Sequence, residues 1–217
     1  MARWLENLIG IGVAVLLVAA PVAYGLHVQA EFRKFRVVSE GKLYRSGQLS
    51  LPALKRIIHD YGIRTVVSLR ETDGPGKAPQ EAREEAYCDA QEINYYRIPP
   101  RNWSAPAGPP PVEKGVRKFL AVMSDPANYP VLIHCFAGIH RSGAYCAIYR
   151  MEFEHRSNAA AIAELEESGY DNLPVELDIL GYLEDFRPSW REDIKPEPAP
   201  KSEGKKKKHS AKKWASE

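Results

Sequence analysis

The segment from His134 to Gly143 reads His-Cys-Phe-Ala-Gly-Ile-His-Arg-Ser-Gly and holds the residue types needed to bind and attack a phosphate group. Cys135 can act as a thiolate nucleophile, and Arg141 carries a planar guanidinium that can hold two phosphate oxygens. The intervening backbone can curl so that its N–H groups point at an anion, and the five residues that do so are Phe136, Ala137, Gly138, Ile139 and His140. A thiol in that positive field is favoured as the thiolate. The segment therefore predicts an anion-binding loop with Cys135 at its floor.

The elements around this loop are typical of an α/β protein. The apolar run 131–134 predicts a buried central strand of a parallel sheet, and a helix is expected at about 142–155. Further elements alternate along the chain: a hairpin at 35–46, a helix after Ser50, a strand at 65–69, an acidic helix at 80–92, a strand at 95–98, a helix around 116–123, and helices at 157–168 and 174–186. We predict a single α/β domain with a central, mostly parallel sheet of about four or five strands and helices on both faces.

The motif His-Cys-x5-Arg-Ser resembles the active-site loop of the protein tyrosine phosphatase superfamily, and residues 35–184 resemble its compact, atypical dual-specificity branch of bacterial type. The segments Phe35-Arg-Val-Val and Gly41-Lys-Leu-Tyr-Arg-Ser-Gly-Gln48 are similar to the start of such phosphatases. The resemblance implies that Cys135 attacks phosphorus and that the amides of residues 136–141 and the Arg141 side chain hold the oxygens. It further implies that Ser142 eases departure of the thiolate, that His134 supports the thiolate by a hydrogen bond, and that no metal or organic cofactor takes part.

The general acid of that family, an Asp before the active-site strand, has no counterpart here. Between Asn94 and Ser124 the chain has no Asp, and Glu113 is the one carboxylate. Asp73, on the loop after the strand at 65–69, is the other candidate, since loops at strand C-termini face the same crevice. Without a strong acid, a phenolate with a pKa of about 10 is an easier leaving group than an alkoxide. We therefore expect phosphotyrosine, a phosphoprotein or an aryl phosphate as substrate.

Other functions stay open on the sequence. The missing acid also fits a catalytically silent phosphate-recognition module, a pseudophosphatase tethered to the membrane. Inositol phosphates are a lesser alternative, because relatives acting on such ligands often carry Lys at the position of Ile139, and neither Phe136 nor Ile139 supplies a cation. A sulfurtransferase of the rhodanese kind is weaker still, since its loop generally has one residue fewer and lacks the preceding His.

The three cysteines, Cys88, Cys135 and Cys146, form no disulfide framework, and no two have the C-x-x-C spacing of a zinc or redox site. Cys88 and Cys146 are predicted to be packing residues. No metal site is expected at His140, because no second His or carboxylate stands at ligand spacing from it.

Both chain ends differ from the middle. Residues 7–26 contain no charged residue and are long enough for a transmembrane helix, which predicts a membrane anchor within residues 1–30. A cleaved signal ending near Val28-Gln29-Ala30, with export of the protein, is the alternative. Arg33, Lys34 and Arg36 on the C-terminal flank place the phosphatase domain, residues 31–188, in the cytoplasm.

Residues 189–217 are rich in Lys, Pro, Glu and Ser and are expected to be disordered. Residues 201–217 hold seven Lys and two Glu, a local excess of +5 against +2 for the whole chain, so the rest of the chain is mildly acidic. This distribution argues against a nucleic-acid-binding domain, which would carry its cations through the fold. The tail is either a solvated segment or a contact for anionic lipid.

Overall fold

Five short strands form one sheet in the computed structural model, which describes residue 4 and residues 12–22, 32–70 and 80–191. The strands are β1 (Arg36–Ser39), β2 (Leu43–Ser46), β3 (Thr65–Ser68), β4 (Asn94–Arg97) and β5 (Val131–His134), in the order β1-β2-β5-β3-β4. β1 and β2 are antiparallel, and the pairs β2–β5, β5–β3 and β3–β4 are parallel. The prediction of a mostly parallel sheet with the 131–134 strand at its centre is confirmed.

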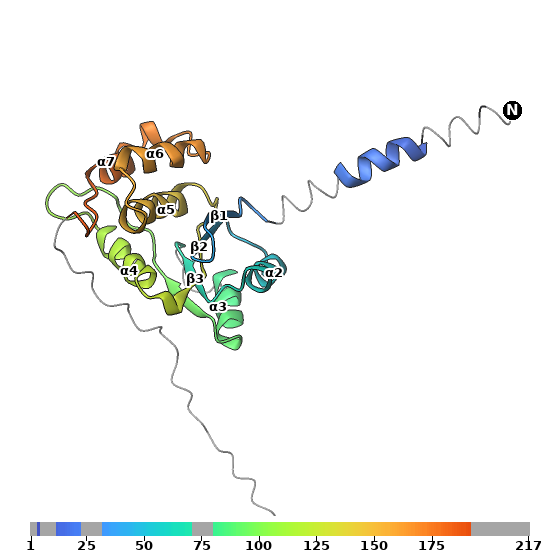
Figure 1. Ribbon diagram of the computed structural model, residues 1–217, viewed down its shortest axis with the longest axis horizontal. Coiled ribbons are helices and arrows are strands. Elements are labelled where there is room, and N and C mark those ends of the chain that lie inside the picture. Colours follow the sequence, from blue (N-terminus) through green and yellow to red (C-terminus); the bar gives the residue numbers. More distant parts are fainter. Residues whose placement is uncertain (1–3, 5–11, 23–31, 71–79, 192–217) are drawn as a thin grey trace, which may run out of the picture.

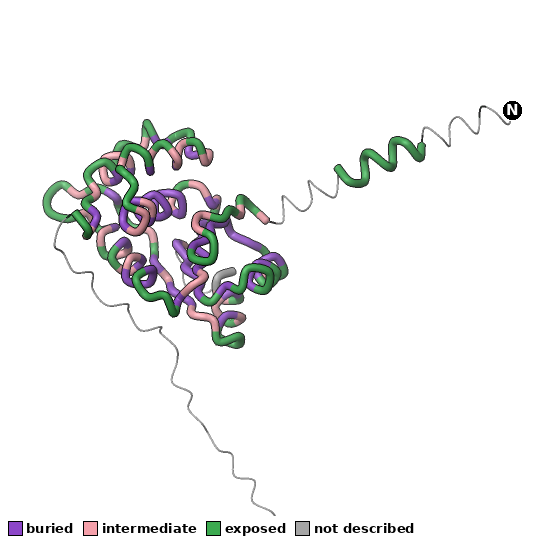
Figure 2. Tube along the Cα trace, in the orientation of Figure 1, coloured by how far each residue is buried: buried purple, intermediate pink, exposed green. Residues whose placement is uncertain are grey.

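Helices cover both faces of the sheet (Figure 1). Because side chains alternate along a strand, Tyr44, Val66, Leu132 and Tyr95 share one face, where they pack with α2 (Leu51–Tyr61) and α3 (Gln80–Ala90). The other face is covered by α4 (Glu113–Met123), α5 (His140–Phe153), α6 (Asn158–Glu167) and α7 (Leu177–Asp185). Two short 3₁₀ helices, η1 (Pro126–Asn128) and η2 (Leu173–Val175), lie in the connections. Figure 2 shows buried residues concentrated in the sheet and in α5, so the strand and helix that flank the loop are the centre of the core.

Helix α2 shows why local sequence predicted these elements well. The Ser50 side chain accepts a hydrogen bond from the Ala53 N–H, and Gly62 ends the helix in the left-handed region at φ 61°. The apolar side chains of Leu54, Ile57 and Ile58, which recur at helical spacing, are buried.

The observed bounds differ from the predicted ones where the chain leaves a tight turn. Helix α5 begins at His140, two residues before the predicted start, because the loop passes directly into the first helical turn. The last predicted helix divides into η2 and α7, with Glu176 between them in a non-helical conformation.

Several predictions concern residues outside the described ranges. Residues 7–11 and 23–26 of the predicted anchor, Asp73 and the Lys-rich tail at 201–217 all lie there. Within the described ranges, no helix has both the length and the apolar composition needed to cross a membrane. The transmembrane helix is therefore unsupported by the structure and stays a prediction from the sequence.

Candidate active site

The predicted loop connects the central strand β5 to α5. Cys135 directly follows β5 and has a side chain that is 3% exposed. Its sulfur accepts a hydrogen bond from the Gly138 N–H at 3.2 Å and lies 3.3 Å from the Ser142 hydroxyl. Both groups are hydrogen-bond donors to a thiolate, which is the form that a nucleophile requires. The structure thus brings Cys135, Gly138 and Ser142 together.

Gly138 is required at its position by both conformation and space. Its φ is +75°, and a Cβ there would come within 2.3 Å of the Gly47 nitrogen. The neighbouring Gln48 N–H donates to the Phe136 carbonyl at 3.0 Å. The segment after β2 therefore packs against the loop and stabilises its conformation. This role of Gly47 and Gln48 was not predicted from the sequence, although both residues belong to the Gly41–Gln48 motif.

Arg141 is directed toward the carboxyl ends of the parallel strands. Its Nη1 donates to the Leu69 carbonyl oxygen at 2.9 Å, just beyond β3. β3 pairs in register with β5 up to Ser68 and His134, so the Arg141 guanidinium and Cys135 are held at the same edge of the sheet. Arg141 also lines a small pocket with Leu69, Ile98, Pro100, Arg101, Trp103, Val112 and Tyr145.

His134 lies on the sheet face that packs against α3. Its Nε2 is 3.6 Å from a carboxylate oxygen of Glu84, and both side chains are almost fully buried. The Tyr95 hydroxyl donates to the same oxygen at 3.3 Å, and burial together with the charge of Glu84 raises the pKa of Tyr95. A buried carboxylate of this kind needs such partners. Glu84 was not predicted as part of the site, because its helix was predicted only as acidic.

His140 has an aromatic neighbour that was not predicted from the sequence. Its ring contacts that of Tyr170, with centroids 4.7 Å apart. The Tyr170 hydroxyl donates to Glu176 at 2.6 Å, and burial and the Glu176 carboxylate raise the pKa of Tyr170. The connection between α6 and α7 therefore packs against the loop at His140.

Of the two general-acid candidates, Glu113 is described, and its carboxylate is engaged by α7. It accepts a hydrogen bond from the Tyr182 hydroxyl at 2.6 Å, in a pocket that also contains Asp178. Burial and this bond raise the pKa of Tyr182, which keeps the phenol protonated and donating. Trp103 lines both this pocket and the one at Arg141. Glu113 thus belongs to a neighbouring pocket, while Asp73 lies outside the described residues.

Cations from other segments surround the exposed side of the loop. Phe136 is 55% exposed, and two guanidinium groups, those of Arg33 and Arg70, lie 5.0 Å and 5.3 Å from the centroid of its ring. Arg70 is oriented by a hydrogen bond to the Gln48 side chain at 2.9 Å. The loop itself contributes the guanidinium of Arg141, and neighbouring segments add those of Arg33 and Arg70.

The other two cysteines differ from Cys135 in their surroundings. All three thiols are free and buried. Burial raises the pKa of Cys88 to about 12, and the Glu84 charge adds to that effect. Burial likewise raises the pKa of Cys146 to about 12, against an opposing effect of Arg45 and Arg150. Both stay as thiols at neutral pH, as expected for packing residues.

A mixed five-stranded α/β sheet with a Cys-x5-Arg loop between its central strand and a helix defines the class of phosphatases with a tyrosine- or dual-specificity-phosphatase fold. A family model described as "DSP-PTPase phosphatase fused to NAD+ Kinase" matches residues 24–175, and the chain belongs to this family of dual-specificity-type phosphatases.

Two relatives agree with that assignment. The chain is 32% identical over 129 residues to a putative tyrosine-protein phosphatase, OCA1 of Mycosarcoma maydis, covering 58% of this chain and 73% of OCA1. It is 25% identical over 128 residues to the tyrosine-protein phosphatase-like protein OCA2 of Saccharomyces cerevisiae, covering 59% of this chain and 60% of OCA2.

Two solved structures share the fold. They are the core catalytic domain of the PP-IP phosphatase SIW14 from S. cerevisiae and P. aeruginosa TpbA. Each has a TM-score of 0.54 and 20% sequence identity, with 71% of this chain and 85% of the other covered.

Proposed function

We propose that this chain hydrolyses phosphomonoesters through a cysteinyl-phosphate intermediate formed on Cys135. The observation that carries the proposal is the pair of donors at the Cys135 sulfur, the Gly138 N–H at 3.2 Å and the Ser142 hydroxyl at 3.3 Å. These contacts stabilise a thiolate at the floor of a loop that ends in the guanidinium of Arg141.

In the first step the Cys135 sulfur attacks phosphorus, and the bond from phosphorus to the ester oxygen breaks. The amides of the loop and the Arg141 side chain hold the remaining oxygens as charge moves onto them. In the second step water attacks the phosphocysteine, the S–P bond breaks, and inorganic phosphate leaves. The Ser142 hydroxyl donates to the departing thiolate, which lowers the barrier of this step.

This site favours an aryl phosphate as substrate, such as the phosphotyrosine of a phosphoprotein. Glu113 is held by Tyr182, so it is badly placed to protonate a leaving group at Cys135. A phenolate leaves with less protonation than an alkoxide does. The exposed ring of Phe136 beside Cys135 offers a surface on which an aryl group can pack. Another structure of the fold neighbour TpbA is a complex with pTyr.

Inositol phosphates are a second candidate, and one observation favours them. Arg33 and Arg70 flank Phe136, and they supply the cations that residues 136 and 139 lack. Charge-assisted contacts from several guanidinium groups suit a ligand with more than one phosphate. The fold neighbour SIW14 is named a PP-IP phosphatase.

Turnover separates both enzymatic candidates from a catalytically silent phosphate-recognition module. The full chain is incubated with p-nitrophenyl phosphate, beside Cys135→Ser and with vanadate. Turnover that is blocked by vanadate and abolished by the substitution supports the phosphatase. Well-folded protein without turnover that still binds a phosphopeptide through Arg141 supports the pseudophosphatase instead.

Membrane anchoring through residues 7–26, with the phosphatase domain on the cytoplasmic side, is a separate proposal that rests on the sequence. The absence of charge in that stretch and the cations at 33, 34 and 36 support it. Contact of the Lys-rich tail with anionic lipid is part of the same proposal. Carbonate extraction of membranes tests it, because a peripheral protein is released while an anchored one stays in the pellet.

A further inference from the structure

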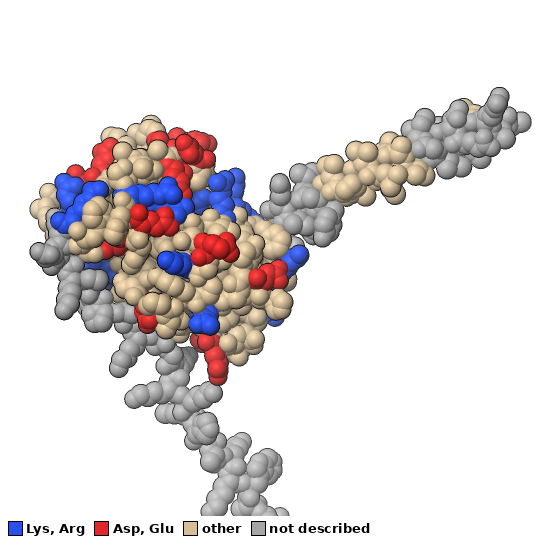
Figure 3. Space-filling view, in the orientation of Figure 1, with Lys and Arg blue, Asp and Glu red and all other residues tan. Residues whose placement is uncertain are grey.

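A third pocket lies beside α5, on the side of the β1–β2 hairpin. It has a volume of about 240 Å³ and is bordered by the hairpin, α5 and α6. Ligand pockets for drug-sized molecules are larger, roughly 300–1,000 Å³, so this one suits a compact ligand. Its charged lining residues are Arg36, Arg45, Arg150, Glu164 and Glu167. In Figure 3, basic side chains gather in the region where the hairpin meets α5 and α6.

Arg45 is the unusual member of this set. It is 4% exposed, yet its described contacts include no carboxylate. Both terminal nitrogens donate to one hydroxyl, that of Ser168, at 3.3 Å, and the buried Nε has no partner among the described atoms. A buried guanidinium is costly unless a counter-charge and its hydrogen bonds compensate it. Arg45 therefore lacks an anion that its position calls for.

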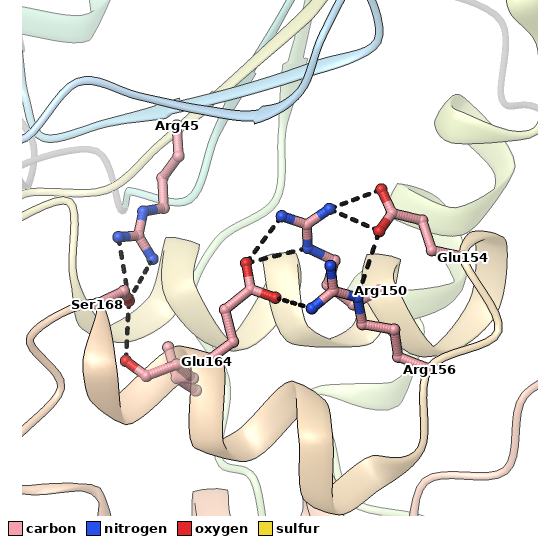
Figure 4. Close-up of polar contacts among 7 residues, drawn as sticks. Arg45, Arg150, Glu154, Arg156, Glu164 and Ser168 are labelled. Carbon is pink, nitrogen blue, oxygen red and sulfur yellow. Dashed lines mark hydrogen bonds and ion pairs between the residues drawn. The ribbon is translucent and has the colours of Figure 1, made fainter.

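Two nearby carboxylates, those of Glu164 and Glu154, are already engaged by other arginines (Figure 4). One oxygen of Glu164 accepts from Arg150 and the other accepts from Arg156, each with a contact of 2.8 Å. Glu154 accepts two hydrogen bonds from Arg150. Arg45 stands apart from this network in Figure 4 and reaches only Ser168.

Arg36 adds a second cation on the same side of the hairpin. In the antiparallel pair of β1 and β2, Arg36 lies directly opposite Arg45. Side chains at opposite positions point to the same face, and like charges there are destabilising. Both residues also line the pocket. An anion between them would offset this repulsion and satisfy the free Nε of Arg45.

We propose that this pocket is a second oxyanion site, distinct from the Cys135 loop, that binds a phosphate group between Arg45 and Arg36. A guanidinium matches the paired oxygens of a tetrahedral oxyanion. The site adjoins the first turn of α5, because a Cβ on Gly143 would come within 3.1 Å of Arg45 Nη1. The inference does not depend on the proposed catalytic activity.

Calorimetric titration of the full chain with inorganic phosphate tests the proposal, in an Arg141→Ala background that weakens binding at the catalytic loop. One site is expected to remain. Adding Arg45→Gln should weaken it about tenfold or more, since a charge-assisted hydrogen bond is lost. Adding Glu167→Gln removes an exposed negative charge that repels phosphate from the pocket lining, so it should tighten phosphate binding roughly twofold. Adding Arg36→Gln removes a positive charge and should weaken phosphate binding by a similar factor.

Arg56→Gln is the matched control, because Arg56 is an exposed arginine on α2, on the opposite face of the sheet, and should leave the affinity unchanged. Glycerol 3-phosphate as a second probe distinguishes a phosphate ester from free phosphate as the ligand. If it binds more tightly than inorganic phosphate, the ligand is a phosphate ester. If it binds equally or more weakly, the ligand is free phosphate. The proposal is overturned if no phosphate binds in the Arg141→Ala background. It is also overturned if Arg36→Gln and Glu167→Gln, whose folding is checked by thermal melting, leave the affinity unchanged.

Discussion

Gly138 of the catalytic loop packs so tightly against Gly47 that a Cβ on Gly138 would come within 2.3 Å of the Gly47 nitrogen. The two glycines come from segments far apart in the chain, the loop after β5 and the segment after β2. Their contact places the Gly138 N–H where it donates to the Cys135 sulfur at 3.2 Å. Backbone packing, and not only the loop's own sequence, therefore orients a donor at the nucleophile.

Gly138→Ala is expected to destabilise the fold and lower activity. A φ of +75° in a residue with a Cβ, together with the clash, costs about 1–3 kcal/mol. The loss of the Gly138 amide from the sulfur should reduce kcat more than it raises KM. Denaturant unfolding and steady-state kinetics measure the two effects. Gly181→Ala, where a Cβ meets nothing within 4 Å, is the control; wild-type activity in Gly138→Ala would contradict the packing argument.

Ser142→Ala should slow the second chemical step more than the first. The Ser142 hydroxyl lies 3.3 Å from the Cys135 sulfur and is fully buried, so its effect falls on the departing thiolate. General acid–base contributions of this kind are about 10²–10⁴-fold. Rapid-quench kinetics should show a burst of p-nitrophenol and accumulation of phosphocysteine. A single slow phase without a burst would place the Ser142 effect elsewhere.

Thiol labelling should separate Cys135 from the other two cysteines. Burial raises the pKa of Cys88 and Cys146 to about 12, so both stay protonated and unreactive until the pH approaches that value. Cys135 has two donors at its sulfur and is expected to react alone with iodoacetate at neutral pH, with protection by phosphate. Mass spectrometry of the modified peptides gives the result. Equal labelling of Cys146 would show that burial does not protect it.

Glu113→Gln should change turnover of an aryl phosphate less than about threefold, because the Glu113 carboxylate is engaged by Tyr182. Loss of a true general acid would lower turnover by about 10²–10⁴-fold. The Tyr182 hydroxyl donates to Glu113 at 2.6 Å, and a neutral amide oxygen can still accept that bond. The pH–rate profile is the more telling measurement. If no general acid acts in the site, kcat should not fall as the pH rises. If kcat of the wild type does fall at high pH and kcat of Glu113→Gln does not, Glu113 is the general acid.

Arg33→Gln should distinguish substrates with several phosphates from those with one. Its guanidinium lies 5.0 Å from the Phe136 ring and adds a positive charge at the side of the loop. Loss of one exposed charge should raise KM for an inositol polyphosphate roughly twofold to fivefold and leave p-nitrophenyl phosphate nearly unchanged. Arg64→Gln, an exposed arginine before β3, serves as control. Equal effects on both substrates would remove the case for the polyphosphate.

Much of the fold followed from local patterns. Ser50 marked the start of α2, the apolar run 131–134 predicted the central strand, and both are confirmed. The position of α5 was less well predicted because the loop enters the helix at His140, and no capping side chain marks that start. Local signals are strong where one residue satisfies a helix end and weak where tertiary contacts do so.

The contacts around the loop could not be predicted in the same way. Glu84 stood in an unremarkable acidic helix, and its approach to His134 depends on how α3 packs on the sheet. Tyr170 reaches His140 only because the α6–α7 connection folds back over α5. Glu113, a candidate acid by sequence position, is turned toward Tyr182 instead.

The sequence by itself determined the chemistry of the site, because Cys135, the loop and Arg141 are contiguous and their spacing sets how the backbone can surround an anion. Tertiary structure decided what surrounds that loop. The arginines at Phe136, the partner of Glu113 and the unmatched Arg45 behind Gly143 come from segments that meet only when the sheet and helices pack. Hydrogen bonds and charge interactions act over a few ångströms, so sequence distance does not reveal them until the fold sets the spatial distance.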